Sequence, residues 1–394
     1  MISGRAAHFV SVATPWGAAV DTRSPWPARY YAALIAQAIR YGMPSTRRLG
    51  RLWSFAGRRG IPEREMAAVL RRLPRRPRPD VEGLLANAAS AWPSLAEQAA
   101  RLPSARPTLL TALAIERSAG LTTFVFGDEP PPLLVLKVPH GSDAALRLDA
   151  TALREAAPAD VAPRALGTVG GAYAQEALPG TPLRVEPLTV AGVSELCWPR
   201  SLESLGAGLT RLSTTTVKSR SPVDVAPFIE VVKADRDLSP RARRTIGAAG
   251  RDVRGLSTSV LRHRDTSAQN CLFRGDRLIG IVDWEMSTPA GSPGFDTLNA
   301  ALAWVEHGLG LERWSEQRAV AALASGWAAS RFWTAARGAA RAAASAGGVP
   351  ERHQGALETL FFAARTGARA TRPERRWVTG VEASRAMLEI VCAS

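Results

Sequence analysis

The stretch "VLRHRDTSAQNCLFRGDRLIGIVDWEMSTP", residues 260–289, decides how the rest of the chain is interpreted. It places Asp265, Asn270 and Asp283 in that order, with short apolar runs between them. The letters CLFRGDRLIGIVDW predict two short strands joined by a turn at Gly275–Asp276. Such a hairpin would bring Asp283 back beside the loop that carries Asp265 and Asn270.

Three oxygen-bearing side chains at one point suit phosphoryl transfer from a nucleoside triphosphate to an alcohol. That reaction needs a carboxylate near the attacking hydroxyl, oxygen ligands for Mg²⁺ and positive charge near the nucleotide phosphates. Mg²⁺ prefers carboxylate and neutral oxygens to sulfur or imidazole. The cysteines Cys197, Cys271 and Cys392 form no CxxC pair, so we expect reduced thiols rather than a disulfide framework or a zinc site.

The same residues resemble a known family. HRDTSAQN, residues 263–270, fits the H-x-D-x-x-x-x-N catalytic loop of protein-kinase-like enzymes. GIVDWE, residues 280–285, is similar to the metal-binding segment of the aminoglycoside phosphotransferase and choline kinase family, in which Trp or Phe follows the Asp. GSPGFDTLNAAL, residues 291–302, resembles the segment that usually comes next. The resemblance is specific over residues 263–300 and extends back to about residue 108.

The resemblance implies a role for each polar residue of this region. Asp265 would orient or deprotonate the acceptor hydroxyl, and Asn270 and Asp283 would hold Mg²⁺. His263 would support the loop without reacting, and Asp296 would brace it. These roles predict ATP or GTP as the phosphoryl donor and a hydroxyl of a small molecule as the acceptor.

Residues further upstream are implied to contact the nucleotide. Lys137, in VLKVP, resembles the strand lysine that reaches the nucleotide phosphates. Glu155, in a helical segment, is the expected partner of that lysine, with Asp149 on the same helix as the alternative. The segment AQEALPGTPL resembles the connector between two lobes, whose backbone near Glu176 and Leu178 would contact the base.

The sequence departs from the related patterns at two places. The phosphate loop G-x-G-x-x-G of protein kinases has no full counterpart, because AIERSAGLTTFVFG contains only Gly120 and Gly127. Ser118 is therefore the candidate phosphate contact in this loop. Arg264 and Thr266 stand where small-molecule kinases more often have Gly and Leu or Phe, although the longer pattern that follows favours those kinases.

Changes in composition divide the chain into three regions. Residues 1–104 are basic and mainly helical in pattern. Residues 105–182 contain short strands and one helix, and residues 183–394 are mainly helical apart from the hairpin. We therefore predict an α+β, two-lobed protein-kinase-like fold, with a small β-rich N-lobe and a larger helical C-lobe after a helical basic N-terminal extension.

The net charge of +15 is concentrated in the first region, where residues 1–104 carry 16 Arg and no Lys against 6 Asp or Glu. This extension could contact nucleic acid, an anionic lipid surface or a protein partner, or it could be a solvated helical segment that packs on a lobe. The chain offers no run of about 18 apolar residues for a transmembrane segment. The first twenty residues lack the compact apolar part of a secretory signal, so we expect a cytoplasmic protein.

Two functions remain open from the sequence alone. The first is a Mg²⁺-dependent phosphotransferase, a small-molecule kinase whose acceptor is a hydroxyl of an antibiotic, a sugar or a biosynthetic intermediate. The second is a catalytically weak kinase-like binding or scaffold module whose basic extension recruits a partner. A polycationic acceptor would need an acidic pocket, which Glu306, Glu312 or Glu316 could supply.

Overall fold

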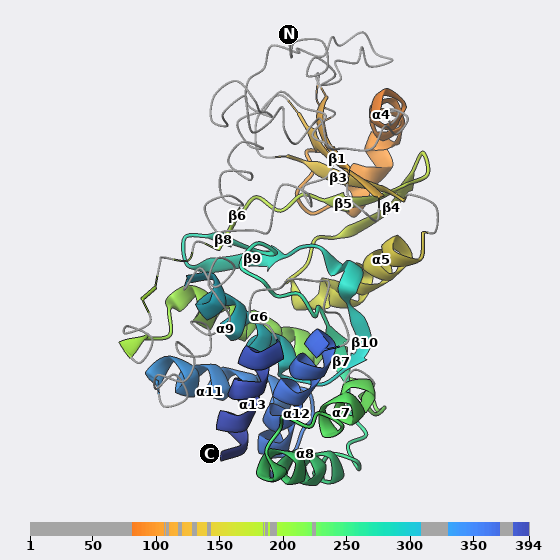
Figure 1. The fold of residues 1–394 in the computed structure, drawn as a ribbon. Coiled ribbons are helices and arrows are strands. Elements are labelled where there is room, and N and C mark those ends of the chain that lie inside the picture. The colour runs from red at the N-terminus through yellow and green to blue at the C-terminus, as the bar shows by residue number, and fades with distance from the viewer. Residues whose placement is uncertain are drawn as a thin grey trace, which may run out of the picture. The chain divides into compact units, whose positions relative to one another are not determined.

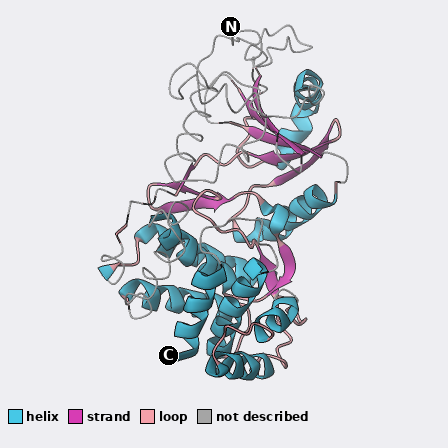
Figure 2. Ribbon diagram, viewed as in Figure 1, coloured by secondary structure: helices cyan, strands magenta, loops and turns pink. Residues whose placement is uncertain are grey.

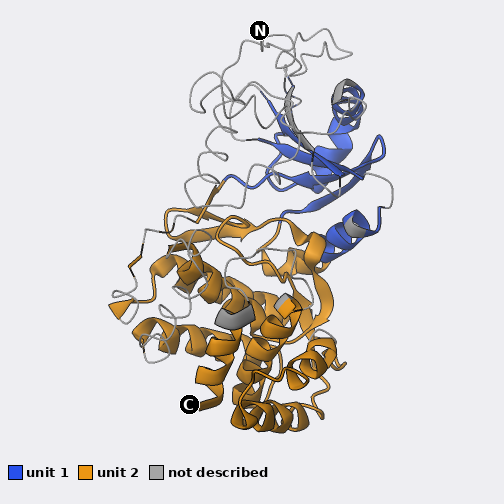
Figure 3. Ribbon diagram, in the orientation of Figure 1, with its two compact units in different colours: residues 1–154, 163–179 blue, residues 155–162, 180–394 orange. Residues whose placement is uncertain are grey.

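The structure, a computed structural model, divides the chain into two compact units (Figure 3). Unit 1 comprises residues 1–154 and 163–179, and unit 2 comprises residues 155–162 and 180–394. The described part is mixed α+β, as predicted (Figure 2). The structure describes residues 81–393 apart from 106, 108–109, 117–119, 128–131, 140–142, 184, 186–187, 190–194, 223–225, 309–329 and 371–380.

Unit 1 is built on a five-stranded antiparallel sheet in the order β1-β2-β3-β5-β4 (Figure 1). The strands β2, β3, β4 and β5 and the helix α5 all lie in segments where the sequence predicts them. The elements are α4 (Val81–Gln98), β1 (Thr111–Glu116), β2 (Gly120–Phe126), β3 (Leu134–Pro139), α5 (Ala144–Ala156), β4 (Ala165–Val169) and β5 (Ala172–Glu176).

The first strand, β1, is absent from the sequence-based prediction. Its residues, TALAIE, include Ala, Leu and Glu, which favour helix over strand. The segment is nevertheless a strand, because it pairs with β2 from Thr111 opposite Phe126 to Glu116 opposite Leu121. Sheet pairing therefore overrides the local preference here.

Gly120, at the start of β2, meets a packing requirement of the sheet. It lies opposite Pro139 in β3, and a Cβ atom at this position would collide with the carbonyl oxygen of Val138. Only glycine allows this close approach of two strands. One of the two glycines in the expected phosphate loop is thus explained by strand packing.

Helix α4 belongs to the region predicted as an N-terminal extension, yet it shares a hydrophobic core with the sheet. Leu85, Ala88 and Trp92 are fully buried in the same cluster as Leu134 of β3. Proline usually interrupts a helix, but α4 continues through Pro93, whose side chain lies on the exposed face. Residues 1–80 of the predicted extension lie outside the described residues.

Unit 2 is mainly helical, with a three-stranded sheet in the order β6-β8-β9 and a two-stranded sheet of β7 and β10. Helix α11 packs on α6 and α9, and α12 packs on α7, α8 and α13. No helix among the described residues is long and apolar enough to cross a membrane. The elements are η3 (Ala157–Ala159), β6 (Thr181–Pro182), α6 (Arg200–Thr216), α7 (Ala226–Lys233), α8 (Pro240–Asp252), β7 (Val260–Arg262), β8 (Cys271–Arg274), β9 (Arg277–Ile281), η5 (Trp284–Met286), β10 (Thr288–Gly291), α9 (Phe295–Gly308), α11 (Arg331–Ala346), α12 (Glu351–Ala370) and α13 (Val381–Ala393).

Candidate active site

The loop of residues 263–270 is held at both ends by strands. It follows β7, which pairs with β10, and it precedes β8, which pairs with β9 in the predicted hairpin. Within the loop, Arg264 has a φ of 69°, in the left-handed region that glycine adopts without strain. The glycine that related kinases more often have at this position suits that backbone, so the structure gives a physical reason for the family pattern.

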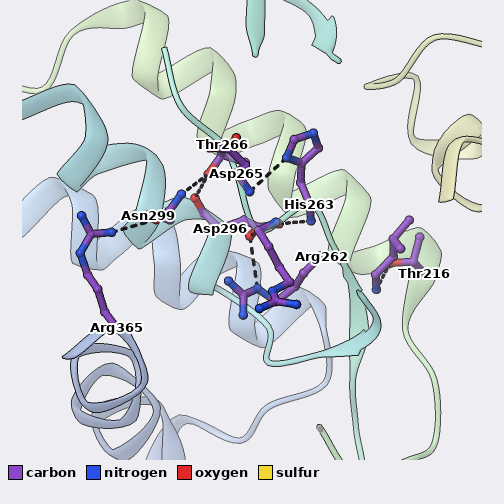
Figure 4. A network of polar contacts seen from close by, with 10 residues as sticks. Thr216, Arg262, His263, Asp265, Thr266, Asp296, Asn299 and Arg365 are labelled. Carbon is purple, nitrogen blue, oxygen red and sulfur yellow. Dashed lines mark hydrogen bonds and ion pairs between the residues drawn. The ribbon is translucent and has the colours of Figure 1, made fainter. Parts of the chain in front are cut away.

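Asp296, in the first turn of α9, binds the start of this loop (Figure 4). Its carboxylate accepts hydrogen bonds from the backbone N–H of His263 at 2.6 Å and of Arg264 at 3.1 Å. It also accepts one from Nε of Arg262 at 3.2 Å, and the guanidinium of Arg262 lies 4.9 Å from the ring centre of Phe295. This geometry fits the bracing role expected for Asp296.

His263 is fully buried, and both of its ring nitrogens are engaged. Nε2 lies 2.9 Å from the carbonyl oxygen of Val282, and Nδ1 accepts a hydrogen bond from the backbone N–H of Asp265 at 3.2 Å. These two contacts make Nδ1 an acceptor and Nε2 a donor. The edge of the ring also packs against Trp284, with 4.7 Å between ring centres. A ring held in this way can support the loop, but it has no free nitrogen for a substrate.

Asp265 and Asn270 lie against each other within the loop. The side-chain N–H of Asn270 donates to Oδ2 and to the backbone oxygen of Asp265, both at 3.0 Å. Burial raises the pKa of the Asp265 carboxyl above its ordinary value, and the negative charge of Asp283 adds to the rise, while the interactions with His263 and Asn270 oppose it. Asp265 follows β7 and Asp283 follows β9, so the hairpin of β8 and β9 joins the two aspartates along the chain.

Asp283 follows β9 directly and has a φ of 71°, again in the left-handed region. The backbone N–H of Val282 donates to the backbone oxygen of Asn270 at 2.8 Å, which aligns the two segments. Trp284 is fully buried and donates from its ring N–H to the carbonyl oxygen of Ile281 at 2.7 Å. This bond joins the residues on either side of Val282 and Asp283 and so holds the turn that carries Asp283.

The oxygen atoms of this group fit a magnesium ion. Asn270 turns its N–H toward Asp265, so its carbonyl oxygen and the carboxylate of Asp283 are the side-chain oxygens that would hold the ion. Within the described ranges, no group of three or more His, Cys, Asp or Glu side chains could hold a metal ion. Mg²⁺ commonly keeps several water ligands and uses one or two carboxylates, so a small set of protein oxygens is sufficient.

Lys137 does not form the ion pair that the sequence predicts. Its Nζ lies 2.7 Å from Oδ2 of Asp149, and both residues are buried, with exposures of 7% and 2%. Glu155, the expected partner, instead forms an ion pair with Lys218. Lys218 also donates to the carbonyl oxygen of Pro289 at 3.3 Å. The alternative considered for the pair, Asp149, is the carboxylate that the structure pairs with Lys137.

The geometry of helix α5 explains why Asp149, and not Glu155, pairs with Lys137. Asp149 and Glu155 are six residues apart in α5, which at about 100° per residue places them about 120° apart around the helix axis. Asp149 lies on the buried face together with Leu146, Ala152 and Leu153. In the sequence, the buried partner can be recognised as the carboxylate that falls within the apolar stripe of the helix. The number of residues between the lysine and the carboxylate does not identify this partner.

The predicted connector contains a second buried carboxylate. Glu176 is 1% exposed, and its Oε1 accepts a hydrogen bond from the backbone N–H of Arg101 at 2.8 Å. The backbone N–H of Ala177 donates to Leu133 at 3.1 Å. Leu178, the other connector residue expected at the base, is buried at 4% exposure. Ser118 lies outside the described residues.

A chain of polar side chains that no sequence motif predicts reaches the loop from α12. Nη1 of Arg365 donates to Oδ1 of Asn299 at 3.0 Å, and Nδ2 of Asn299 donates to Oγ1 of Thr266 at 3.3 Å (Figure 4). Asn299 lies within the segment of residues 291–302 but has no role assigned to it there, and Arg365 lies in no motif. The only sequence signal was Thr266 itself, which departs from the family pattern.

Comparison with family models supports the resemblance. The model described as "Phosphotransferase enzyme family" matches residues 111–333, more than half of the chain. This range begins at β1 and includes the loop of residues 263–270, the hairpin and α9. None of the curated proteins matches the chain.

Solved structures are similar to the chain at low identity. A macrolide 2'-phosphotransferase from Brachybacterium faecium is 22% identical, with 68% of this chain and 89% of that chain covered and a TM-score of 0.38. A choline/ethanolamine kinase family protein from Mesorhizobium loti is 15% identical, with 79% and 94% covered and a TM-score of 0.38. An ethanolamine kinase from Plasmodium vivax is 10% identical, with 72% and 82% covered and a TM-score of 0.41.

Proposed function

Because the chain belongs to the phosphotransferase enzyme family, we propose that it transfers the terminal phosphoryl group of a nucleoside triphosphate to a hydroxyl of a small molecule. The observation that carries the proposal is the grouping of Asp265, Asn270 and Asp283 on a loop and hairpin braced by Asp296. In sequence, each of these residues matches a position of the motif that the chain resembles.

Asp265 would accept a hydrogen bond from the acceptor hydroxyl and orient it for attack on the phosphoryl group. Its raised pKa means that the carboxyl has a higher proton affinity than an exposed Asp, which suits a group that takes up a proton. Asn270 and Asp283 would hold Mg²⁺, which when bound neutralises charge on the nucleotide phosphates.

Lys137 would contact the nucleotide phosphates, and Asp149 would hold its ammonium group in place at 2.7 Å. An ammonium group that is paired with a buried carboxylate has a fixed position, which is what a phosphate contact needs. The backbone groups of Leu178 would bind the base, and Glu176 would fix the connector through its bond to Arg101.

The proposal specifies the phosphoryl acceptor only as a small molecule with a hydroxyl group. Glu306 was one of the acids considered for binding a polycationic acceptor, but its carboxylate lies 2.6 Å from Nη2 of Arg365. This ion pair neutralises the charge that such an acceptor would use. Glu312 and Glu316 lie outside the described residues.

Titration calorimetry with ATP and with GTP, with and without Mg²⁺, tests the nucleotide site. We expect Mg²⁺-dependent binding that Asp283→Asn weakens by at least about tenfold, because the variant loses one carboxylate ligand. Asp276→Asn is the matched control, since Asp276 is an exposed residue at the turn of the same hairpin. Equal binding by both variants would refute the assignment of Asp283.

A binding or scaffold module remains the second candidate, but nothing in the described residues favours it. Asp265→Asn separates the two functions: phosphoryl transfer should fall by several orders of magnitude while nucleotide binding persists. A folded wild-type protein that binds neither nucleotide in the presence of Mg²⁺ would refute the proposed activity.

A further inference from the structure

The residue that follows Asp265 uses its hydroxyl group in two hydrogen bonds. Thr266 is 1% exposed, and its Oγ1 donates to the backbone oxygen of Asp296 at 2.8 Å. The same oxygen accepts the bond from Asn299 at 3.3 Å. The Leu or Phe that related kinases more often have at this position could make neither bond. This chain therefore has a polar attachment beside its candidate catalytic aspartate.

Asn299 connects this attachment to another helix. It lies on α9, three residues after Asp296, and its Oδ1 accepts the hydrogen bond from Arg365 of α12 at 3.0 Å. Because Nδ2 faces Thr266 and Oδ1 faces Arg365, both partners assign the same amide orientation. Every donor then points the same way, from Arg365 through Asn299 and Thr266 to the backbone oxygen of Asp296. A charged first donor strengthens such an aligned chain.

Arg365 is itself held in a fixed orientation. Its Nη2 lies 2.6 Å from Oε1 of Glu306, and the two side chains are 14% and 19% exposed. Its Nε is buried and has no hydrogen-bond partner among the described residues. The guanidinium therefore gives up one hydrogen bond and directs its two other nitrogens at α9. The guanidinium of Arg365 is therefore held in one orientation, although its Nε makes no hydrogen bond to the described residues.

We propose that Arg365 is a positioning residue that acts through Asn299 and Thr266 on the loop of residues 263–270 and so fixes the position of Asp265. The structural part of this proposal is independent of the activity. Its kinetic part rests on the proposed phosphotransferase function. The experiments below keep the two parts separate.

Hydrogen–deuterium exchange of the full-length protein tests the structural part. Arg365→Met keeps much of the side-chain volume but removes the chain's first donor, so amides in residues 263–270 should exchange about tenfold faster. Arg385→Met is the matched control. Arg385 is 20% exposed and its Nη2 lies 2.9 Å from Oδ2 of Asp235, but this pair makes no bond to the loop. The control should leave exchange of the loop unchanged.

Hydrolysis of MgATP, with water as the acceptor, tests the kinetic part. Arg365→Met should lower kcat about tenfold and change the KM for ATP less than about twofold, because a displaced Asp265 impairs transfer but not nucleotide binding. Arg365→Lys should keep the charge beside Glu306 but lose the planar fork that also holds Asn299. It should therefore keep wild-type thermal stability and show the lower kcat, which a merely structural role does not predict.

A double variant provides a check of the path. Thr266→Val removes the hydroxyl that receives the chain, so Thr266→Val with Arg365→Met should be little worse than either variant alone. If the double variant instead lowers kcat by the product of the two single-variant factors, the path through Asn299 is contradicted.

The outcomes distinguish this proposal from the proposed function. Loop exchange that is the same in Arg365→Met as in wild type, or no faster than in Arg385→Met, overturns the proposal. Faster loop exchange with an unchanged kcat in an active protein overturns the positioning role. A wild-type protein that neither binds nor hydrolyses MgATP would refute the proposed function, and the exchange result would still decide the structural part.

Discussion

Replacing Asp149 with Asn tests which carboxylate holds Lys137. The structure pairs Lys137 with Asp149 at 2.7 Å, whereas the sequence predicts Glu155 as the partner, with Asp149 as the alternative. The matched variant is Glu155→Gln, which makes the same chemical change on the same helix, α5. Each substitution removes one negative charge and nearly preserves side-chain volume, so packing changes little.

The exposed fractions of the two pairs set the expected magnitudes. The Lys137 and Asp149 side chains are 9% and 3% exposed, and leaving one charge of a buried pair uncompensated costs about 3–5 kcal/mol. Asn can still accept one hydrogen bond from the ammonium group, so we expect Asp149→Asn to cost about 2–3 kcal/mol. The Lys218 and Glu155 side chains are 33% and 21% exposed, and solvent screening limits the cost of Glu155→Gln to about 1 kcal/mol or less.

Two measurements compare the effects of Asp149→Asn and Glu155→Gln. Hydrogen–deuterium exchange of β3 reports the local free energy of opening within unit 1, and calorimetry with MgATP reports nucleotide affinity. Asp149→Asn should lower both, and Glu155→Gln should leave the exchange of β3 within about twofold of wild type. A larger loss of nucleotide affinity in Glu155→Gln than in Asp149→Asn would refute the reasoning, because Lys137 would then depend on Glu155 in the nucleotide-bound protein.

Three further predictions concern the loop and α9. Arg264→Gly should retain nucleotide binding and be within about 1 kcal/mol of wild-type stability in urea unfolding, because glycine relieves the positive φ, whereas Arg264→Val should cost about 1–2 kcal/mol. Asp296→Asn leaves N–H groups of the loop facing an amide, so stability should fall by about 1.5–3 kcal/mol, with faster exchange of residues 263–270. Burial lowers the pKa of His307 to about 4, so the unfolded chain takes up a proton below pH 6.5 that the folded chain does not. Stability should therefore fall by up to about 3 kcal/mol between pH 6.5 and pH 4, and urea unfolding of His307→Gln should show a smaller fall.

Local spacing made the loop and hairpin predictable from sequence. Asp265 and Asn270 lie within one loop, and a short hairpin returns Asp283 to it. The relative positions of the three side chains therefore depend on the backbone conformation of one short, continuous segment. Asp296 follows the hairpin closely and could be placed by the family pattern. The family match over residues 111–333 confirms the resemblance, and the roles of the individual residues remain predictions.

Contacts between distant segments could not be predicted in the same way. Arg365 lies 66 residues after Asn299, and their contact depends on how α12 packs beside α9. An arginine on an Ala-rich helix carries no local sign of such a partner. The choice between Asp149 and Glu155 is different, because the buried apolar stripe of α5 includes Asp149 and not Glu155.

The candidate site keeps its shape despite unfavourable features. Arg264 and Asp283 are two of the three described non-glycine residues with positive φ, each at a cost of about 1–2 kcal/mol, and the charge of Asp283 raises the pKa of Asp265. These costs are offset by contacts that involve no ligand, namely the hydrogen bonds of Asp296 to the loop and the packing of His263 on Trp284. A site shaped before its ligand arrives spends less binding energy on rearrangement. Substitutions in these supporting contacts should therefore reduce the transfer rate even where the protein still folds.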